Sequence, residues 1–393
     1  MEHRVRNAAR AIARSGPVLR TGALVALALW ASAVLVGCHK PTKPKPARYR
    51  LFVGYSAPKG DILVFDTETD SLVDSIAAGW GFINDVPDAP YFAPRYAGDA
   101  CFHVLETTTL AEVGRGCGWN DAFVAASENR LVAFAPAVGM YGNKVIITEM
   151  TGKPLEYDTL FTRQEIDSAH FSSVEFWQID ARAGLVYGLV TYPIEGGGSG
   201  RDLIAYDYRQ HLRRIWRVRP DGPDSWASWI RTFHLHPDGR RIYFATYTKN
   251  GSEILCYDLQ REEVVFRGPA RSGFEWVRVT PDGGEVWVSE PGDPWDDFGP
   301  RYHKIAVLDA DNGSLKAEIP TDTLALRPEF PWTAVPQQIR FVPGSSKAYL
   351  ATYDEQGGVE PRLAVLDTKG HRIEKILSNK FGDLRSLVVA PIQ

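Results

Sequence analysis

The feature that most constrains the fold is a short apolar run that ends in an acidic residue and recurs seven times along the chain. The runs ILVFD, FHVLE, VIITE, LIAYD, ILCYD, IAVLD and LAVLD end at Asp66, Glu106, Glu149, Asp207, Asp258, Asp309 and Asp367. Successive acids lie 40 to 58 residues apart. Another apolar run precedes each of them, and a turn with a third run follows. Such short runs with turn signals between them predict antiparallel strands in a repeating fold.

A fourth run precedes each unit and often closes on a turn, as in FHLHPDGR and WVRVTPDGG. Four antiparallel strands per repeat are typical of propeller blades, so we predict an all-β, seven-bladed β-propeller over residues 49–393. The unit that starts at Tyr49 lacks its leading strand, whereas the chain ends with an extra run, LRSLVVAP. We therefore expect the C-terminal strand to complete the first blade, which closes the ring and removes exposed sheet edges.

The units resemble the YVTN-type β-propeller repeats of bacterial and archaeal surface proteins, which overlap with the quinoprotein-like propellers. The segments GDILVFDTETDSLVDSI, HPDGRRIYFATY and LAVLDTKGHRIEKIL carry this resemblance. Blades two and three depart from the pattern because they lack the Pro-Asp-Gly turn in its usual place. The resemblance implies the fold and leaves the activity open, since one fold supports many functions.

Residues 1–37 have the parts of a secretory signal: five arginines, then an uncharged apolar run from Ala23 to Val36, then small residues. The motif LVGC resembles the lipobox of bacterial lipoproteins, which implies cleavage after Gly37 and a lipid such as palmitate on Cys38. An uncleaved N-terminal anchor is the alternative. The Lys/Pro-rich residues 38–48 predict an extended tether. We therefore expect an extracytoplasmic protein that is lipid-anchored to a bacterial membrane, on the periplasmic side or at the cell surface.

Charge and cysteine content exclude some classes of function. Without residues 1–37 the chain has 39 basic and 47 acidic residues, a net charge of −8, which argues against nucleic acid as a partner. Beyond Cys38 only Cys101, Cys117 and Cys256 remain, too few for a disulfide scaffold or a paired Cys-x-x-Cys site. Cys101 and Cys117 flank the turn LETTTL, so either a disulfide between neighbouring strands or two buried thiols fit the sequence.

Polar residues recur at one position near the start of the predicted innermost strands. They are Asp121, Glu175, Arg231, Glu275, Gln337 and Arg385. A second set, further along the same strands, comprises Asn84, Gln178, His234, Arg278 and Arg340. A ring that mixes Arg and Glu could bind a polar ligand through charge-assisted hydrogen bonds. The alternative is that these charges pair with one another and with water.

Aromatic residues mark the loops that enter the same strands. They are Trp80, Trp119, Trp177, Trp229, Trp276 and Trp332, and Tyr55, Tyr192, Tyr247 and Tyr353 end four of the second strands. Flat amphipathic rings suit a glycan, a small ligand or a partner protein. Packing between blades is the alternative, and it is favoured by the placement of one Trp per blade. The acidic, aromatic loop over residues 290–303 is a further candidate for recognition.

Three other motifs are better explained by structure than by chemistry. His234 and His236 could share a metal, but no third ligand is evident, so a structural pair is favoured. DADNGS begins like a calcium loop, yet its twelfth position is Pro320 rather than a bidentate Glu, which favours a hairpin turn. The strand-end acids are expected to accept hydrogen bonds from their own turn amides.

These features favour a monomeric binding module over an enzyme, because no hydrolase, metalloprotease or dinucleotide motif is present. We expect a partner protein, glycan or small ligand at the loop face and no cofactor, with calcium as an option. The enzyme alternatives are a metal-dependent lactonase or lyase and a quinoprotein-like oxidoreductase at the channel mouth. The metal of a metal-dependent enzyme would take oxygen ligands from Glu175, Asp121, Asn84 and Glu275. The arginines of the ring would repel that metal. A structural cell-envelope component is the third alternative.

Overall fold

The computed structural model describes residues 48–392 apart from the segments 56–59, 87–88, 97–100, 118–122, 128–129, 136–143, 150–153, 160–172, 181, 194–198, 208, 211, 217, 219–228, 249–250, 269–275, 291–302, 325–333, 355–361 and 379–383. For some residues on strands, only the backbone is described. The predicted signal, Cys38 and the tether up to residue 47 therefore lie outside the described residues. In the part of the chain that is described, no helix has both the length and the apolar character needed to cross a membrane.

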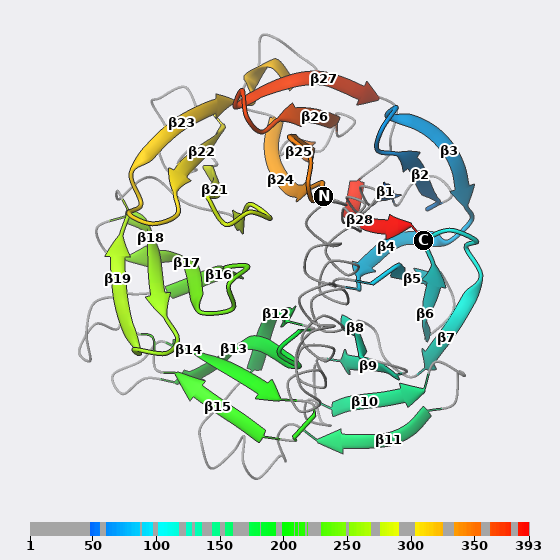
Figure 1. Ribbon diagram of the computed structural model, residues 1–393, viewed down its shortest axis with the longest axis horizontal. Helices are drawn as coiled ribbons and strands as arrows, with labels where there is room; N and C mark the ends of the chain where they lie inside the picture. Colours follow the sequence, from blue (N-terminus) through cyan, green and yellow to red (C-terminus); the bar gives the residue numbers. More distant parts are fainter. Residues whose placement is uncertain are drawn as a thin grey trace, which may run out of the picture. The chain divides into compact units, whose positions relative to one another are not determined.

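Seven four-stranded antiparallel sheets contain all 28 strands of the described chain (Figure 1). From the innermost strand outward, they are β28 (Leu384–Ile392), β1 (Arg48–Tyr55), β2 (Ile62–Asp66) and β3 (Ser71–Ile76); β4 (Gly79–Asp85), β5 (Tyr91–Tyr96), β6 (Cys101–Glu106) and β7 (Glu112–Cys117); β8 (Phe123–Ser127), β9 (Arg130–Ala135), β10 (Lys144–Glu149) and β11 (Pro154–Thr159); and β12 (Ser173–Asp180), β13 (Leu185–Pro193), β14 (Ser199–Asp207) and β15 (Leu212–Trp216). The remaining sheets are β16 (Trp229–Leu235), β17 (Arg241–Thr248), β18 (Gly251–Asp258) and β19 (Glu263–Arg267); β20 (Val277–Val279), β21 (Glu285–Glu290), β22 (Lys304–Asp309) and β23 (Leu315–Pro320); and β24 (Ala334–Phe341), β25 (Lys347–Asp354), β26 (Leu363–Asp367) and β27 (Arg372–Ser378). A short 3-10 helix, Asp322–Leu324, follows β23. The predicted all-β propeller with four-stranded antiparallel blades is confirmed.

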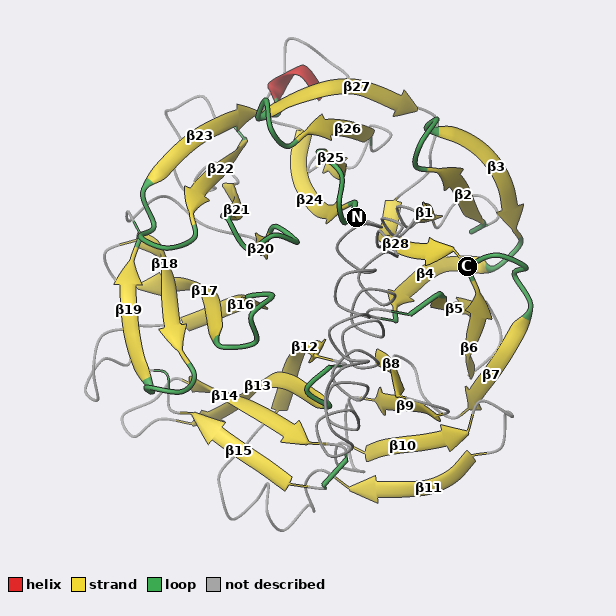
Figure 2. Ribbon diagram, viewed as in Figure 1, coloured by secondary structure: helices red, strands yellow, loops and turns green. Residues whose placement is uncertain are grey.

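The blades follow one another around a ring, with their innermost strands at its centre (Figure 2). Strand β4 contacts β28 and β8, β12 contacts β8 and β16, and β16 contacts β20. Strand β24 contacts β21 and β28, which completes the circuit. Strand β28 pairs with β1 in antiparallel register from Arg48↔Ile392 to Tyr55↔Leu384. The C-terminal strand thus supplies the inner strand of the first blade, as predicted, and the two ends of the propeller share one sheet.

The hydrophobic core lies between neighbouring blades. Tyr187 and Trp216 of one sheet pack with Phe233 and Phe244 of the next in one buried cluster. At the joint between the first two blades, the rings of Phe52 and Phe92 stack with their centroids 4.0 Å apart. Each large apolar side chain buried in this way contributes roughly 1.5–3 kcal/mol to folding. These joints of the ring are therefore stabilised by buried apolar side chains that neighbouring blades contribute together.

The strand-end aspartates hold the hairpin turns, as predicted. Asp66 Oδ1 accepts the amide N–H of Glu68 at 3.0 Å and of Thr69 at 2.9 Å. The same bonds to the second and third following amides occur at Asp207, Asp258 and Asp309, and Asp367 accepts the amide of Lys369. The DADNGS segment is accordingly one of these turns. Hydrogen bonds of this kind replace backbone partners that a tight turn leaves unsatisfied.

After five of the strand-end acids, the fourth following residue is described and has a left-handed backbone. The φ angles are 55° at Asp70, 61° at Leu110, 60° at Glu262, 72° at Gly313 and 47° at His371. Glycine adopts this conformation without steric cost, whereas other residues lose roughly 1–2 kcal/mol. Four of these five turns therefore tolerate a side chain where glycine would be less strained. Asp70 and His371 use that side chain for contacts with a neighbouring blade.

Candidate functional site

The innermost strands are irregular near their starts. An extra residue interrupts the pairing between Ile230 and Thr232 in β16, between Pro336 and Gln338 in β24, and between Leu384 and Ser386 in β28. The extra residues are Arg231, Gln337 and Arg385, three of the predicted ligand-binding positions. Strands β4 and β12 have a similar irregularity after Gly79 and after Glu175. Such bulges redirect side chains and are common beside binding sites.

Beyond the bulges, some polar side chains of the inner strands bond to the backbone of the next blade. Gln178 Oε1 accepts the N–H of Leu235 at 2.7 Å, and Gln338 Oε1 accepts the N–H of Leu387 at 2.9 Å. Ser386 Oγ accepts the N–H of Ile83 at 2.8 Å. Each of these bonds satisfies a backbone donor at a joint between blades. Gln178 therefore has a structural role in joining two blades.

Arg278, Arg340, His234 and Asp85 form a second group, which we call the axial cluster. They lie on the innermost strands β20, β24, β16 and β4. Arg340 donates from Nε to the Leu387 carbonyl at 2.9 Å, and its Nη2 lies 4.0 Å from Asp85 Oδ1. Arg278 donates from Nη1 to its own neighbour, the Val277 carbonyl, at 2.8 Å. The cluster thus brings two half-buried guanidinium groups together with one carboxylate whose side chain is 50% exposed.

The positive charges of the axial cluster repel one another. Burial and the positive charge of Arg340 lower the pKa of Arg278 to about 9, and the negative charge of Asp85 only partly opposes this. Burial, and then the charges of Arg278 and Arg340, hold the pKa of His234 well below its usual value. A cation that is destabilised by its surroundings in this way marks a candidate functional site. The cluster therefore has the electrostatic character of a site that lacks a counter-ion.

His234 uses only one ring nitrogen for its described contacts. Its Nδ1 lies 3.0 Å from the Leu235 carbonyl oxygen and 3.4 Å from the Val279 amide nitrogen. Both contacts use the same nitrogen, so Nε2 has no partner among the described residues. His236 contacts a different group, because its Nε2 lies 3.0 Å from the Gly283 carbonyl oxygen. The two histidines therefore contact different groups. The described residues contain no group of three or more His, Cys, Asp or Glu that could hold a metal ion.

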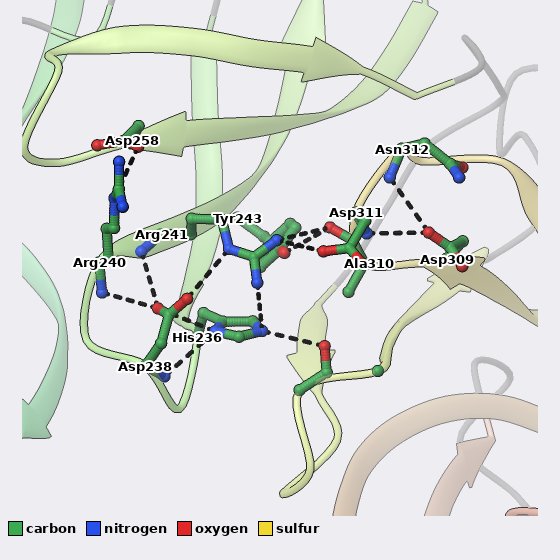
Figure 3. A network of polar contacts seen from close by, with 12 residues as sticks. His236, Asp238, Arg240, Arg241, Tyr243, Asp258, Asp309, Ala310, Asp311 and Asn312 are labelled. Carbon is green, nitrogen blue, oxygen red and sulfur yellow. Dashed lines mark hydrogen bonds and ion pairs between the residues drawn. The ribbon is translucent and has the colours of Figure 1, made fainter.

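A different set of charges links the blades at the hairpin turns, and we call these contacts the rim latches. In each latch, the start of the second strand of one blade contacts the turn between the third and fourth strands of the next. Arg241 of β17 contacts Asp311 at 2.7 Å, and Tyr243 donates to the Ala310 carbonyl at 2.7 Å (Figure 3). Arg241 also contacts Asp238 at 3.2 Å and the ring of His236 at 3.0 Å. Positive and negative groups are paired throughout this network.

The other rim latches follow the same rule. Glu285 of β21 lies 3.1 Å from Nε2 of His371, and Lys316 contacts it at 2.8 Å. Arg50 of β1 donates to the Thr107 and Thr108 carbonyls at 2.6 and 3.0 Å. Burial raises the pKa of Glu285, but hydrogen bonds from Lys316, Trp287 and His371 more than offset this and hold it below its usual value. These charges favour the folded state.

The latch at the ring closure is the most enclosed. Asp70, with a side chain only 4% exposed, contacts Lys347 at 3.0 Å and Lys375 at 2.7 Å. It also accepts the hydroxyl of Tyr349 at 2.5 Å, and Lys347 donates to the Thr67 carbonyl at 2.8 Å. Burial raises the pKa of Asp70, but the bonds from Lys375, Tyr349 and Lys347 lower it by more. One carboxylate thereby joins the N-terminal strands of the first blade to β25 and β27.

Among the aromatic candidates, the structure describes the side chains of Trp276 and Tyr55. Trp276 is 6% exposed and donates from Nε1 to the Pro336 carbonyl of the next blade at 2.9 Å. This is the packing alternative. Tyr55 is half-buried, and its hydroxyl lies 3.4 Å from Asp61 Oδ2. This contact leaves the ligand-binding prediction for Tyr55 untested.

The side chains of the other aromatic candidates, and of the first polar set near the strand starts, lie outside the described residues. For one group only the backbone on a strand is described, namely Trp80, Glu175, Trp177, Tyr192, Trp229, Arg231, Tyr247, Gln337, Tyr353 and Arg385. The remaining candidates fall in segments that are not described, namely Asp121, Trp119, Glu275, Trp332 and most of the loop 290–303. The backbone of the first group confirms only that Glu175, Arg231, Gln337 and Arg385 lie on innermost strands.

The cysteines separate into two kinds. Cys101 is disulfide-bonded, and the register of β6 and β7 places it directly opposite Cys117. This position supports the disulfide alternative for the pair. Cys256 is a free, buried thiol, and burial raises its pKa to about 11. It is an unreactive core residue, since only the thiolate is nucleophilic.

Sequence reasoning identified three of the four residues of the axial cluster, His234, Arg278 and Arg340, but missed Asp85 and all of the rim latches. Asn84 was the residue predicted on this innermost strand, and Asp85 is the residue that follows it. The sequence thus placed a polar residue next to Asp85 without identifying Asp85 itself. The available signal for the latches was the non-glycine residue four places after the strand-end acid. Asp70 and His371 occupy that position, where an unstrained turn would carry Gly.

Comparisons with known proteins agree on the fold. No family model matches the chain, and no curated protein matches it. Among solved structures, the chain is similar to a putative 6-phosphogluconolactonase from Bacteroides uniformis, with 12% identity, a TM-score of 0.54, and 87% of this chain and 99% of that chain covered. It is similar to the β-propeller domain of Cps50 (Swd1) from Myceliophteria thermophila, with 12% identity, a TM-score of 0.54 and coverage of 80% and 93%. It is also similar to the dihydro-heme d1 dehydrogenase NirN, with 13% identity, a TM-score of 0.53 and coverage of 84% and 63%. At such identities the likeness concerns the fold alone, and the chain is a β-propeller.

Proposed function

We propose that this β-propeller is a lipid-anchored, extracytoplasmic binding module that holds its ligand at the ring axis. The signal-like residues 1–37 and the lipobox-like motif that ends at Cys38 support this location. The Lys/Pro-rich tether that follows would separate the ring from the membrane surface. Resemblance to the YVTN-type surface proteins is consistent with both parts of the proposal.

The observation that carries the binding role is the pair Arg278 and Arg340. In the rim latches, each described cation contacts a carboxylate or a carbonyl group. At the axis, two half-buried guanidinium groups repel each other, and the nearest described carboxylate lies 4.0 Å from one of them. Placing like charges together costs folding free energy, and proteins tolerate such costs where function needs them. A ligand that neutralises the pair would remove this cost.

The packing of Trp276 also makes the axis a better candidate for the ligand site than the loop face. Trp276, the described member of the tryptophan set, is occupied by packing between blades. A lactonase or lyase that depends on a divalent metal at the axis is disfavoured electrostatically, because Arg278 and Arg340 would repel the metal. The proposal therefore keeps the binding role and moves it from the loops to the inner strands.

Thermal melting of the full-length protein in detergent tests the binding role. The panel contains neutral sugars, calcium chloride, carboxylic acids and phosphate, and each is added to the wild type and to the double variant Arg278→Gln/Arg340→Gln. A ligand that binds only the folded state raises the melting temperature. The proposal predicts that at least one compound stabilises the wild type but not the double variant. Equal shifts in both proteins, or none in either, would contradict it.

Metabolic labelling tests the anchor. Cells that express the full chain are grown with radiolabelled palmitate, and the protein is then isolated. The proposal predicts label on the wild type and no label on Cys38→Ser. Absence of label from the wild type would refute lipidation and favour the uncleaved anchor.

A further inference from the structure

The chemistry of the axial ligand can be inferred from the donors that surround it, and this inference rests on the proposed function. We propose that the axial cluster binds a small oxyanion, a carboxylate or phosphate group, between the guanidinium groups of Arg278 and Arg340, with Nε2 of His234 as a third donor. Planar carboxylates and tetrahedral phosphates each present a pair of oxygens, and guanidinium groups bind such a pair through two parallel hydrogen bonds.

The two guanidinium groups have N–H donors that lack a hydrogen-bond partner among the described residues. Each carries five N–H bonds. Arg278 uses Nη1 for the Val277 carbonyl, and its other donors have no partner among the described residues. Arg340 uses Nε for Leu387 and approaches Ile339 with Nη1 at 3.4 Å, while Nη2 faces Asp85 at 4.0 Å. That last distance is too long for a hydrogen bond, so Nη2 is also available to a ligand.

The net charge of the described cluster favours an anion. Its two guanidinium groups face one carboxylate, which leaves at least one positive charge uncompensated among the described residues. Asp85 cannot supply the missing charge for Arg278, whose pKa stays depressed in its presence. A monoanion would balance the described cluster, and a dianion would also favour a charged His234. Neutral sugars have no group that relieves the repulsion between the arginines.

The donors lie on one side of the axis. His234, Arg278 and Arg340 occupy β16, β20 and β24, the innermost strands of three consecutive blades. The polar inner residues on β12 and β4 at the same level, Gln178 and Asn84, are uncharged. Among the described side chains, the positive groups of the axis therefore lie in one sector of the ring, which suits a small group and not a ligand that fills the whole ring symmetrically.

Binding of the oxyanion should be coupled to proton uptake at His234. The charged groups that act on its ring are Arg278 of β20, Arg340 of β24 and His236 of its own segment, and all three disfavour the imidazolium. An oxyanion screens the two arginines and accepts a hydrogen bond from Nε2. The imidazolium also donates from Nδ1 to the Leu235 carbonyl, which lies 3.0 Å away. Affinity should therefore rise as the pH falls.

Isothermal titration calorimetry of the full-length protein in detergent tests the inference. The probes are phosphate, sulfate and malate, with glucose as the neutral control, at constant ionic strength. The variants are Arg278→Gln and Arg340→Gln, and Arg261→Gln is the matched control because that arginine lies on an exposed turn of the neighbouring blade. We expect at least one oxyanion to bind the wild type and Arg261→Gln equally, and at least tenfold weaker binding to each axial variant. Binding of phosphate but not of malate would indicate a phosphate ligand. Binding of malate but not of phosphate would indicate a carboxylate ligand.

Two results would overturn the inference. One is the absence of binding by all three oxyanions; the other is equal affinity in the wild type and both axial variants. Circular dichroism shows first that each variant is folded. If a neutral sugar stabilises the wild type but not the double variant, the oxyanion inference fails and the proposed binding role stands. If no compound in the panel distinguishes the wild type from the double variant, the oxyanion inference and the proposed binding role both fail.

Sulfate separates proton coupling from titration of the ligand, since its charge is constant between pH 5.5 and 7.5. We expect sulfate to bind the wild type several-fold more tightly at the lower pH. In His234→Gln this dependence should disappear while binding remains. A pH dependence that is unchanged in His234→Gln would remove His234 from the site.

Discussion

Arg278 at the ring axis and Lys347 at the rim are both partly buried cations on strands of neighbouring blades, but their surroundings differ. Lys347 contacts the Asp70 carboxylate at 3.0 Å and the Thr67 carbonyl at 2.8 Å. Arg278 contacts one carbonyl of its own strand and is repelled by Arg340. The contact of Lys347 accounts for its presence, because it joins two blades. Nothing in the described fold compensates Arg278, so its charge is better explained by a ligand.

The largest effect is expected at the enclosed rim latch. Asp70→Asn removes the charge that holds Lys347 and Lys375, and we expect a loss of about 2–3 kcal/mol in the free energy of unfolding. The matched control is Asp311→Asn, whose side chain is 83% exposed and should cost less than about 0.5 kcal/mol. Urea unfolding measures both. Equal losses would mean that enclosure does not decide the strength of a latch.

The second effect should have the opposite sign. Arg278→Gln removes the repulsion at the axis, so we expect the ligand-free variant to be more stable than the wild type by roughly 1 kcal/mol. Urea unfolding in a buffer without oxyanions measures this, with Arg261→Gln as the control for loss of a positive charge. A clear loss of stability in Arg278→Gln would show that the axial arginine serves the fold.

The pH dependence of stability sharpens the comparison. The pKa of His234 is depressed in the folded protein, so the unfolded chain binds more protons below the ordinary imidazole pKa near 6.5, and stability falls as the pH drops below that value. The pKa of Asp70 is lowered, so its contribution is lost only as the pH falls through the carboxylate range below about 4. Unfolding of the wild type and His234→Gln between pH 7 and 5 separates the two. The wild type should lose more stability over this interval; parallel curves would argue against a neutral His234.

The smallest effect concerns backbone strain at the rim. Glu262 has a left-handed backbone with φ of 60°, and its contact with Arg214 joins side chains that are each 55% exposed. Glu262→Gly should therefore gain about 0.5 kcal/mol, since relief of strain exceeds the loss of an exposed ion pair. Asp70→Gly should lose stability despite the same relief, because its side chain forms the latch. A loss at both positions would contradict this separation.

The sequence was sufficient for local features and insufficient for contacts between blades. The turns at Asp66 and Asp309 were predictable because the acid and the amides it accepts lie within three residues. Alternation along a strand also placed Arg278 and Arg340 on the inner face. Whether an inner polar residue serves the fold was not predictable, because the bond from Gln178 depends on how closely β16 approaches. The Asp70 latch depends likewise on ring closure, which joins residues more than 270 positions apart.

The most direct test of the account is a crystal structure of the full-length protein grown with selenate, a heavier analogue of sulfate and phosphate. Selenium scatters anomalously, and none is present in the natural amino acids of the chain. The account predicts an anomalous peak within hydrogen-bonding reach of Arg278 and Arg340 in the wild type, and no peak there in Arg278→Gln. A wild-type axis without selenium, or an unchanged peak in the variant, would contradict the claim that these arginines hold an oxyanion.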